Sequence, residues 1–311
     1  MMTALLMVIL LGMTAIVIDI GMVYAERAQL QSGADAAALA IAQDCAQGIN
    51  CDIASATSTA IVLAGANAND NSAAAKVTRE GTTFTVQTST LTAGNQKAVQ
   101  HWFAPILGIN STQVGATAKA SWGSPMAGFA PFPMTFSTCE VKRGSGLQMV
   151  QFHKKNSSTP GCAGGPPGGF GKLDQDPGVC GATIDAAKGT AGSDTGNDVP
   201  SNCDSLLEGW AASIESGTYP VGIFPIYDSV SGNGSNATYG LSGFAAFEVH
   251  GWKWKQGGSK KDQFRADYYP GMDCGNDICL IGKFVKKVML DDGYTLGPPN
   301  DLGITIVKLT G

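Results

Sequence analysis

The sequence predicts an α+β protein: a long N-terminal hydrophobic helix followed by a disulfide-bonded, mainly β globular ectodomain. Three observations support this fold class. The first 18 residues carry no charge, several segments beyond residue 70 have the pattern of β-strands, and the eight cysteines form an even set. We expect three regions: a helix over residues 1–50, a small α+β region over 51–123, and a β-rich region with long Gly and Pro loops over 124–311.

The charge balance excludes a nucleic-acid-binding protein. Lys and Arg total 20 against 25 Asp and Glu, so the net charge is −5. Nucleic-acid binding depends on Lys and Arg clustered on one face. Charged residues are also scarce, at 14% against roughly 25% in ordinary soluble domains. We therefore expect a surface rich in uncharged Ser, Thr, Asn and Gly, which suits the outside of a cell.

The predicted helix begins with an uncharged apolar run, Met1–Ile18, which Asp19 ends. At 1.5 Å per residue this run is about 27 Å long, close to the thickness of the hydrocarbon core of a bilayer. A cleaved secretory signal would carry basic residues ahead of its apolar core, and none precede this run. We expect the helix to be retained, either as a signal anchor or in a chain whose basic leader lies ahead of this numbering.

The helical pattern continues beyond Asp19 to about Gln47, which predicts a helix of roughly 70 Å, far longer than a bilayer requires. Apolar residues from Val23 to Cys45 fall on one stripe at spacings of three, four and seven. The stripe packs either on the globular domain of the same chain or on the same helix of neighbouring copies. The candidate assembly or membrane face comprises Leu5, Leu6, Ile9, Leu10, Met13, Ile16, Val17, Ile20, Val23, Leu30, Ala34, Ala37 and Ile41.

Beyond this helix the sequence predicts a second helix and several strands. Gly48 and Asn50 end the first helix, because Gly and Asn are common at helix C-termini. The later segments predict, in order, a helix over Ile53–Ala66, a hairpin around Glu80–Gly81, a helical turn from His101, and strands over Thr112–Trp122, Met134–Val141, Val221–Ser229, Tyr239–Lys255, Leu280–Leu290 and Gly303–Leu309. We expect Pro125–Pro133 to be an irregular linker, Asn156–Asn202 to be a long loop region, and the C-terminal part to be an all-β domain.

The cysteines are expected to form disulfides in an oxidising compartment. They are Cys45, Cys51, Cys139, Cys162, Cys180, Cys203, Cys274 and Cys279. Proximity in the sequence favours the pairs Cys45–Cys51, Cys274–Cys279 and Cys162–Cys180, which leaves Cys139 with Cys203. A zinc site is disfavoured, because the chain has no C-x-x-C pair and only three His. We expect no bound metal and no cofactor.

Catalytic motifs are missing from the sequence. It contains no G-x-S-x-G nucleophile elbow, no H-E-x-x-H zinc motif and no phosphate-binding P-loop, so no catalytic residue is predicted. Asp174, Asp176, Asp194 and Asp198 lie in Gly-rich turns. There they either bind calcium or, as is more usual for Asp in turns, stabilise the local backbone.

One aromatic and basic segment is a candidate surface-binding strip, formed by Trp252, Lys253, Trp254 and Lys255. Such a strip suits a polysaccharide, an anionic surface or a neighbouring subunit. The alternative is a solvated strand face with its aromatic side buried, which needs no partner.

The stretch Ile18–Ala42 contains the pattern D-x-G-x-x-Y-x-x-x-x-x-L-Q-x-x-A-D-A-A-A-L-A, beginning at Asp19. It resembles the N-terminal segment of the TadE/TadG-like family of Tad (tight adherence) pilus assembly. Pro166–Asp174, Ser193–Asp198 and Ser242–Trp252 are similar to the extracellular part of actinobacterial TadG-like proteins. The resemblance implies a pilus-associated surface protein with a short membrane-spanning or polymer-core helix and no enzyme activity. The N-terminal third also looks pilin-like.

Two departures limit the resemblance. Type IV pilins carry Glu at the fifth position of the mature helix, where this chain has Leu5. Either Met1 is not the mature N-terminus or the register between subunits is set differently. The D-x-S-x-S metal motif of the von Willebrand A domains in some larger relatives is also absent, so a metal-dependent adhesion site is unsupported.

Two functional hypotheses follow. The first is a structural subunit of an extracellular pilus-like filament, with the N-terminal helices in the polymer core and the β-rich domain outside. The alternative is a singly membrane-anchored accessory protein or adhesin of Tad pilus assembly. The expected partners are other copies of the chain or the Tad pilus machinery, with the membrane contacted through the N-terminal helix before or instead of assembly. Both hypotheses place the protein on a bacterial cell surface.

Overall fold

The computed structural model describes residues 2–92, 94–142, 146–152, 169–194, 196, 198–232, 234–255, 257–290 and 293–311. For residues 2–6, 8, 9, 11, 107, 142 and 234 it describes the backbone alone. The chain forms two compact units, residues 1–122 with 307–311 and residues 123–306. A long helix precedes disulfide-bonded, β-rich structure, which confirms the predicted α+β class.

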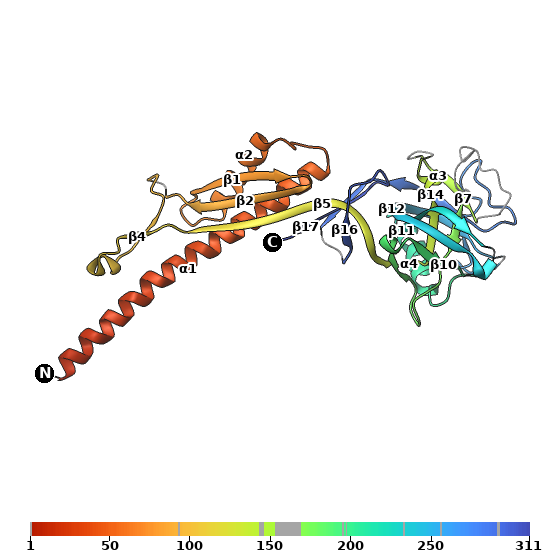
Figure 1. Cartoon of the computed structure of the whole chain (residues 1–311). Coiled ribbons are helices and arrows are strands. Elements are labelled where there is room, and N and C mark those ends of the chain that lie inside the picture. The colour runs from red at the N-terminus through yellow and green to blue at the C-terminus, as the bar shows by residue number, and fades with distance from the viewer. Residues whose placement is uncertain are drawn as a thin grey trace. The chain divides into compact units, whose positions relative to one another are not determined.

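The helix α1 (Met2–Ala46) is continuous, and its N-terminal half projects beyond the sheet of its own unit (Figure 1). Its Ala-rich C-terminal half favours helix through intrinsic propensity. The helix ends where predicted, at Gly48 and Asn50, whose φ angles of 76° and 46° lie in the left-handed region. No helix in the described part of the chain is both long and apolar enough to cross a membrane.

The second helix, α2 (Ile53–Ala66), follows directly and agrees with the prediction. The disulfide Cys45–Cys51 joins the end of α1 to the segment before α2. The Asp52 carboxylate caps α2 by accepting a hydrogen bond of 2.9 Å from the N–H of Ser55. Such a cap satisfies one of the free N–H groups in the first turn of a helix.

A β-sheet completes the packed part of the first unit. β1 (Ala73–Glu80) and β2 (Thr83–Thr90) form the predicted hairpin, and β2 also pairs with the first half of β5 (Gly115–Ala130). α1 lies over β2, α2 lies over β1, and the two helices contact each other. The helices therefore form one layer on the sheet (Figure 1).

A short hairpin lies between β2 and β5. Its strands are β3 (Val99–Gln100) and β4 (Ser111–Thr112), and its tip contains the 3-10 helix η1 (Ala104–Leu107). We call residues 101–110 the hairpin tip. It holds the helical turn that the sequence predicted from His101.

The second unit is built on a sheet with the strand order β7-β14-β12-β11-β6-β8, to which β10 and β13 add beside β12. β9 and β16 pair with the second half of β5. The remaining elements are β6 (Met134–Ser137), α3 (Thr138–Lys142), β7 (Gln148–Gln151), β8 (Phe170–Lys172), β9 (Ala182–Asp185), η2 (Ala186–Lys188), β10 (Thr190–Gly192), α4 (Asp204–Glu215), β11 (Val221–Ser231), η3 (Gly234–Asn236), β12 (Thr238–Lys253), β13 (Gln263–Phe264), β14 (Cys279–Val285), β15 (Lys287–Leu290), β16 (Thr295–Gly297) and β17 (Ile304–Leu309).

Three predictions for this unit are wrong in detail. The C-terminal part is not all β, because α4 buries Leu207, Ala211 and Ile214 at spacings of four and three. The predicted strand Met134–Val141 turns into α3 after four residues. The predicted linker begins as strand, because Pro125 lies in β5 where the pairing with β16 shifts register, a position that tolerates Pro.

The expected loop region Asn156–Asn202 also contains regular structure. Where its residues are described, three short strands, β8 to β10, and η2 lie within it. β8 and β10 join the large sheet through β6 and β12, and β9 joins β5. Strands of three or four residues leave too little alternation for a sequence pattern to show.

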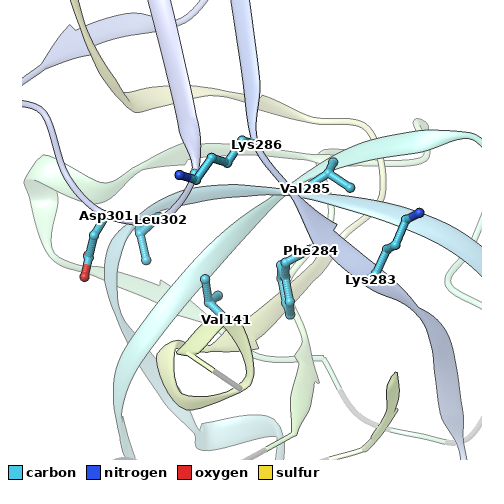
Figure 2. A pocket seen from close by; sticks show the side chains of 8 residues that line it. Val141, Lys283, Phe284, Val285, Lys286, Asp301 and Leu302 are labelled. Atoms are coloured by element: carbon cyan, nitrogen blue, oxygen red, sulfur yellow. The ribbon is translucent and has the colours of Figure 1, made fainter. Parts of the chain in front are cut away.

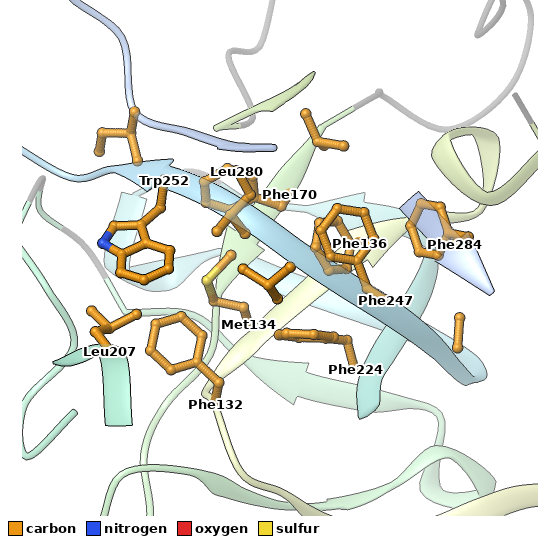
Figure 3. Close-up of a cluster of buried hydrophobic side chains, with 14 of the residues drawn as sticks. Phe132, Met134, Phe136, Phe170, Leu207, Phe224, Phe247, Trp252, Leu280 and Phe284 are labelled. Atoms are coloured by element: carbon orange, nitrogen blue, oxygen red, sulfur yellow. The ribbon is translucent and has the colours of Figure 1, made fainter. Parts of the chain in front are cut away.

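The core of the second unit is an aromatic cluster between the large sheet and α4 (Figure 3). Phe136 is at its centre, with ring centroids 4.8 Å from Phe247, 5.1 Å from Phe224 and 5.3 Å from Phe284. Edge-to-face and tilted contacts at these distances are favourable beyond the area they bury. β12 is apolar because both of its faces are covered: Phe247 and Val249 join this cluster, and Phe244 and Ala246 join a second one on the other face.

Candidate functional site

α1 is buried along its C-terminal half by its own unit. Leu30, Ala34, Ala37 and Ile41 are at most 1% exposed. A Cβ added to Gly33 would lie 2.9 Å from the Cα of Ala64, so the two helices approach as closely as glycine allows. The stripe therefore packs on its own domain, which was one of the two interpretations. The assignment of these four residues to a face for neighbouring copies is wrong.

The N-terminal half of α1 is exposed and apolar. The large exposed side chains are Met7, Leu10, Met13, Ile16, Val17, Ile18, Ile20 and Tyr24. Ile16, Val17 and Ile18 are consecutive and 48%, 67% and 46% exposed. Successive helical residues point about 100° apart, so the exposed apolar side chains extend over more than half of the circumference of the helix instead of following one stripe. A helix that is apolar all round is normally buried by other groups.

For three residues of the predicted face, the structure describes only the backbone. The backbone of Leu5, Leu6 and Ile9 is helical, and their side chains are outside the described residues. Val23 is half-buried and lies where the helix passes from its exposed half to its buried half.

Asp19 fastens the hairpin tip to α1. It is 3% exposed, and its carboxylate accepts hydrogen bonds from three consecutive backbone N–H groups: Trp102 at 2.9 Å, Phe103 at 3.0 Å and Ala104 at 2.6 Å. These N–H groups precede and begin η1, so a side chain from α1 caps the short helix. We call this arrangement the Asp19 latch.

The latch depends on an ionised carboxylate. Burial disfavours the charge, but the three N–H donors and the nearby His101 outweigh it and hold the pKa of Asp19 below its ordinary value. A lowered pKa means that the latch contributes fully above the ordinary pKa of Asp, about 3.9, and is lost as the pH falls through the lowered pKa. The latch is therefore closed throughout the physiological range.

Asp19→Asn is expected to release the hairpin tip without unfolding the unit, because the amide retains one acceptor oxygen and no charge. Hydrogen exchange at pH 7 should show faster exchange of the amides of Trp102, Phe103 and Ala104 and unchanged exchange in β2. Unchanged protection of the three amides would contradict the latch. In the parent chain, Trp102 fluorescence should stay constant from pH 7 to 5 and change only below about pH 4.

The hairpin tip adds apolar surface beside the exposed half of α1. Trp102 is 77% exposed, Ile106 87% and Ile109 53%. Between the tip and α1 lies a pocket of about 350 Å³. Its lining residues are Ile16, Asp19, Ile20, Val23, His101, Ala104, Ile109 and Thr112. We call it the α1 pocket, and together with the exposed helix it is the candidate functional site.

The predicted surface-binding strip is not on the surface. Trp252 and Trp254 are 0% and 2% exposed and belong to the aromatic core, and Lys253 is 8% exposed. The indole N–H of Trp252 donates to the carbonyl of Lys260 at 3.0 Å. Only Lys255 reaches the surface, where its amino group lies 3.0 Å from the carboxylate of Asp198.

The structure confirms two of the predicted disulfides and corrects the others. Cys45–Cys51 and Cys274–Cys279 form as predicted. Cys180 pairs with Cys203, with their Cα atoms 4.8 Å apart, so neither joins its predicted partner. Cys139 is also disulfide-bonded. Cys162 and His153 lie outside the described residues.

Two of the acidic turn residues have different partners. Asp176 accepts hydrogen bonds from both the N–H and the hydroxyl of Thr183. Asp198 pairs with Lys255, which holds the pKa of this carboxyl below its ordinary value. Among the described residues, no three His, Cys, Asp or Glu side chains gather as metal ligands would.

A second pocket, of about 420 Å³, lies in the second unit beside β14 (Figure 2). Its apolar wall includes Val141, Phe284 and Leu302. The amino groups of Lys283 and Lys286 point in different directions in Figure 2, and that of Lys283 contacts Glu248 at 3.0 Å. Convergent polar groups are what mark a polar ligand site, and these two amino groups do not converge. The α1 pocket remains the stronger candidate because it adjoins the exposed apolar half of α1.

Comparison with known proteins adds one finding. No curated protein and no solved structure matches the chain. Residues 1–44 match the Tad family, described as "Putative Flp pilus-assembly TadE/G-like". The match covers the exposed half of α1, the latch residue Asp19 and most of the buried half. At its N-terminal segment, the chain is therefore similar to the Tad family of pilus-assembly proteins.

Proposed function

We propose that the protein is a structural subunit of an extracellular pilus-like filament. The N-terminal halves of α1 from several copies form the core, and the β-rich domain forms the outer surface. The observation that carries this proposal is the exposure of large apolar side chains over more than half of the circumference of α1 between Met7 and Tyr24. A single docking partner covers one side of a helix, whereas a bundle of copies covers every side.

The way α1 is held supports the same role. Its C-terminal half is packed on α2 and β2, and the hydroxyl of Thr88 donates to the carbonyl of Leu30 at 2.9 Å. The Asp19 latch braces the middle of the helix. The apolar half therefore projects from a fixed base, as a polymer core requires, and does not fold back on its own unit.

Location and partners follow from the disulfides and the family similarity. Disulfides persist in oxidising compartments, so the domain functions outside the cytoplasm. Similarity of residues 1–44 to Flp pilus-assembly proteins points to the Tad pilus machinery and to other copies of the chain as partners, on a bacterial surface. The proposal assigns no catalytic residue and no cofactor.

The test is whether the full chain polymerises. Chain purified in mild detergent should form thin fibres when the detergent is diluted, seen by electron microscopy and pelleted by ultracentrifugation. Sheared surface material of the source cells should contain the chain as the repeating component of such a fibre. A chain that stays monomeric on detergent dilution and floats with phosphatidylglycerol–phosphatidylethanolamine vesicles would overturn the proposal in favour of the singly anchored alternative.

A further inference from the structure

The exposed half of α1 presents two different apolar stripes. Ile16, Ile20 and Val23 face the hairpin tip and line the α1 pocket. A second stripe, rotated by about 100° from the first, is formed by Leu10, Val17, Gly21 and Tyr24, at spacings of seven, four and three. We call this second set the bare stripe. Its three side chains are 61%, 67% and 70% exposed.

Gly21 makes the bare stripe accessible to a close neighbour. A Cβ added at this position would meet no atom of the chain within 4 Å. Within the described unit, therefore, no steric contact requires glycine at this point of α1. Glycine does allow another backbone or side chain to approach the helix closely.

The α1 pocket selects an apolar occupant. Both carboxylate oxygens of Asp19 are taken by backbone N–H groups, and the Nε2 atom of His101 lies 2.7 Å from the hydroxyl of Thr112. The other lining side chains are apolar. A charged or strongly polar occupant would lose its water here and find one unpartnered polar atom among these side chains, Nδ1 of His101.

We propose that the α1 pocket of one copy receives the bare stripe of α1 from a second copy, with Gly21 at the centre of the contact. This inference rests on the proposed filament and specifies which surfaces of the same helix meet. Leu10, Val17 and Tyr24 of the second copy lie against the pocket, where Ile16 and Ile109 remain exposed in the single chain.

The apolar area that one copy exposes on α1 and the hairpin tip can be estimated. Full burial of a large apolar side chain is worth about 1.5–3 kcal/mol at about 25 cal/mol per Å², which corresponds to about 60–120 Å². The exposed half of α1 and the hairpin tip carry twelve such residues, exposed by 37–87%. They amount to several hundred Å² per copy, which each copy divides between the contact at its pocket and the contact at its bare stripe. Each contact is therefore smaller than the roughly 800 Å² per partner of a stable interface, and the fibre depends on both contacts of every copy.

The two stripes also determine the kind of assembly. When a pocket on one copy binds a different surface on the next, the contact is heterologous, and each copy still offers one free pocket and one free stripe. Such a contact extends into an open helical fibre unless the rotation closes a ring. A symmetric dimer would instead place the same stripe on both sides.

Cross-linking between two single variants tests the pairing. Ile109→Cys places a thiol at the pocket, and Val17→Cys places one on the bare stripe of another chain. Mild oxidation of the mixed proteins should give a reducible heterodimer in much higher yield than either variant gives alone. Val62→Cys on α2 is the matched control, because Val62 is 65% exposed against 67% for Val17. Mixed with Ile109→Cys, this control should give no heterodimer above background.

Gly21→Leu is an independent test. A Cβ at this position meets no atom within 4 Å, and the substitution removes a glycine from a helix interior, so the single chain should be folded and no less stable. The critical concentration for fibre formation should rise at least tenfold. Gly209→Leu on α4 is the control, because a Cβ there also meets nothing within 4 Å.

The outcomes separate this inference from the proposed function. If the parent chain forms no fibres, the filament proposal fails. If it forms fibres, while Gly21→Leu assembles normally and the Ile109–Val17 pair does not cross-link, the pairing is wrong and the filament stands. Cross-linking of Val17→Cys only to itself would overturn the heterologous contact in favour of a symmetric one.

Discussion

Leu30→Ala is expected to lower the free energy of unfolding of the first unit by about 2–5 kcal/mol. Leu30 is 1% exposed and packs in one cluster with Ala64 of α2, Ala68 of the turn after it and Ala73 at the start of β1. Small neighbours on a helix and a sheet edge cannot move far to fill the vacated space, so a cavity remains. Native-state hydrogen exchange of the β2 amides measures this change for the unit by itself.

Leu10→Ala is the matched control, with the same substitution on the same helix. Leu10 is 61% exposed, so the stability of the single chain should change by no more than about 0.5 kcal/mol. Fibre formation, in contrast, should weaken with Leu10→Ala. Equal destabilisation by the two substitutions would contradict the division of α1 into a buried half and an exposed half.

The extent of α1 could be predicted from the sequence because it depends on local properties. An uncharged run, an Ala-rich continuation and the pair Gly48 and Asn50 define the helix without reference to the rest of the fold. The disulfide Cys45–Cys51 could be predicted for the same reason, since a six-residue separation keeps the two thiols close.

The partners of α1 could not be predicted in this way. The apolar stripe from Val23 to Cys45 has the same pattern whether it meets its own domain or a second copy. The glycine contact between Gly33 and Ala64 decides for the domain, and it exists only after α2 has folded back. Similarly, Cys180 and Cys203 meet because α4 and the short strands position them. The spacing of the cysteines in the sequence does not reveal where these elements lie.

The role of Asp19 depends on residues that are distant in the sequence and meet it only in the folded chain. In the sequence it marks the end of an apolar run and the start of the family pattern. Its hydrogen-bond partners are 83 to 85 residues away, on a hairpin tip whose exposed Trp102 and Ile106 show no periodic pattern. A charge that interrupts a hydrophobic helix would be costly if unpaired. The latch removes that cost and builds one wall of the α1 pocket.

Val17→Glu is expected to abolish fibre formation while leaving the single chain folded. Val17 is 67% exposed, so a carboxylate at this position remains in water in the isolated chain. In a packed core the same carboxylate is buried. It has no cation nearby on α1, because residues 1–18 contain no Lys or Arg. An unpaired buried charge costs about 3–5 kcal/mol. At 1.4 kcal/mol per factor of ten, the critical concentration should rise at least about 100-fold.

Val62→Glu separates this effect from a general increase in solubility. Val62 is 65% exposed on α2, so the control has the same chemistry, the same helical setting and the same exposure. Pelleting at a series of protein concentrations measures the critical concentration of both variants. Assembly lost by Val17→Glu and retained by Val62→Glu would place the contact on α1, because the two chains differ only in where the charge lies. Loss in both variants would mean that added charge alone prevents association, and the apolar half of α1 would then lose its special role in assembly.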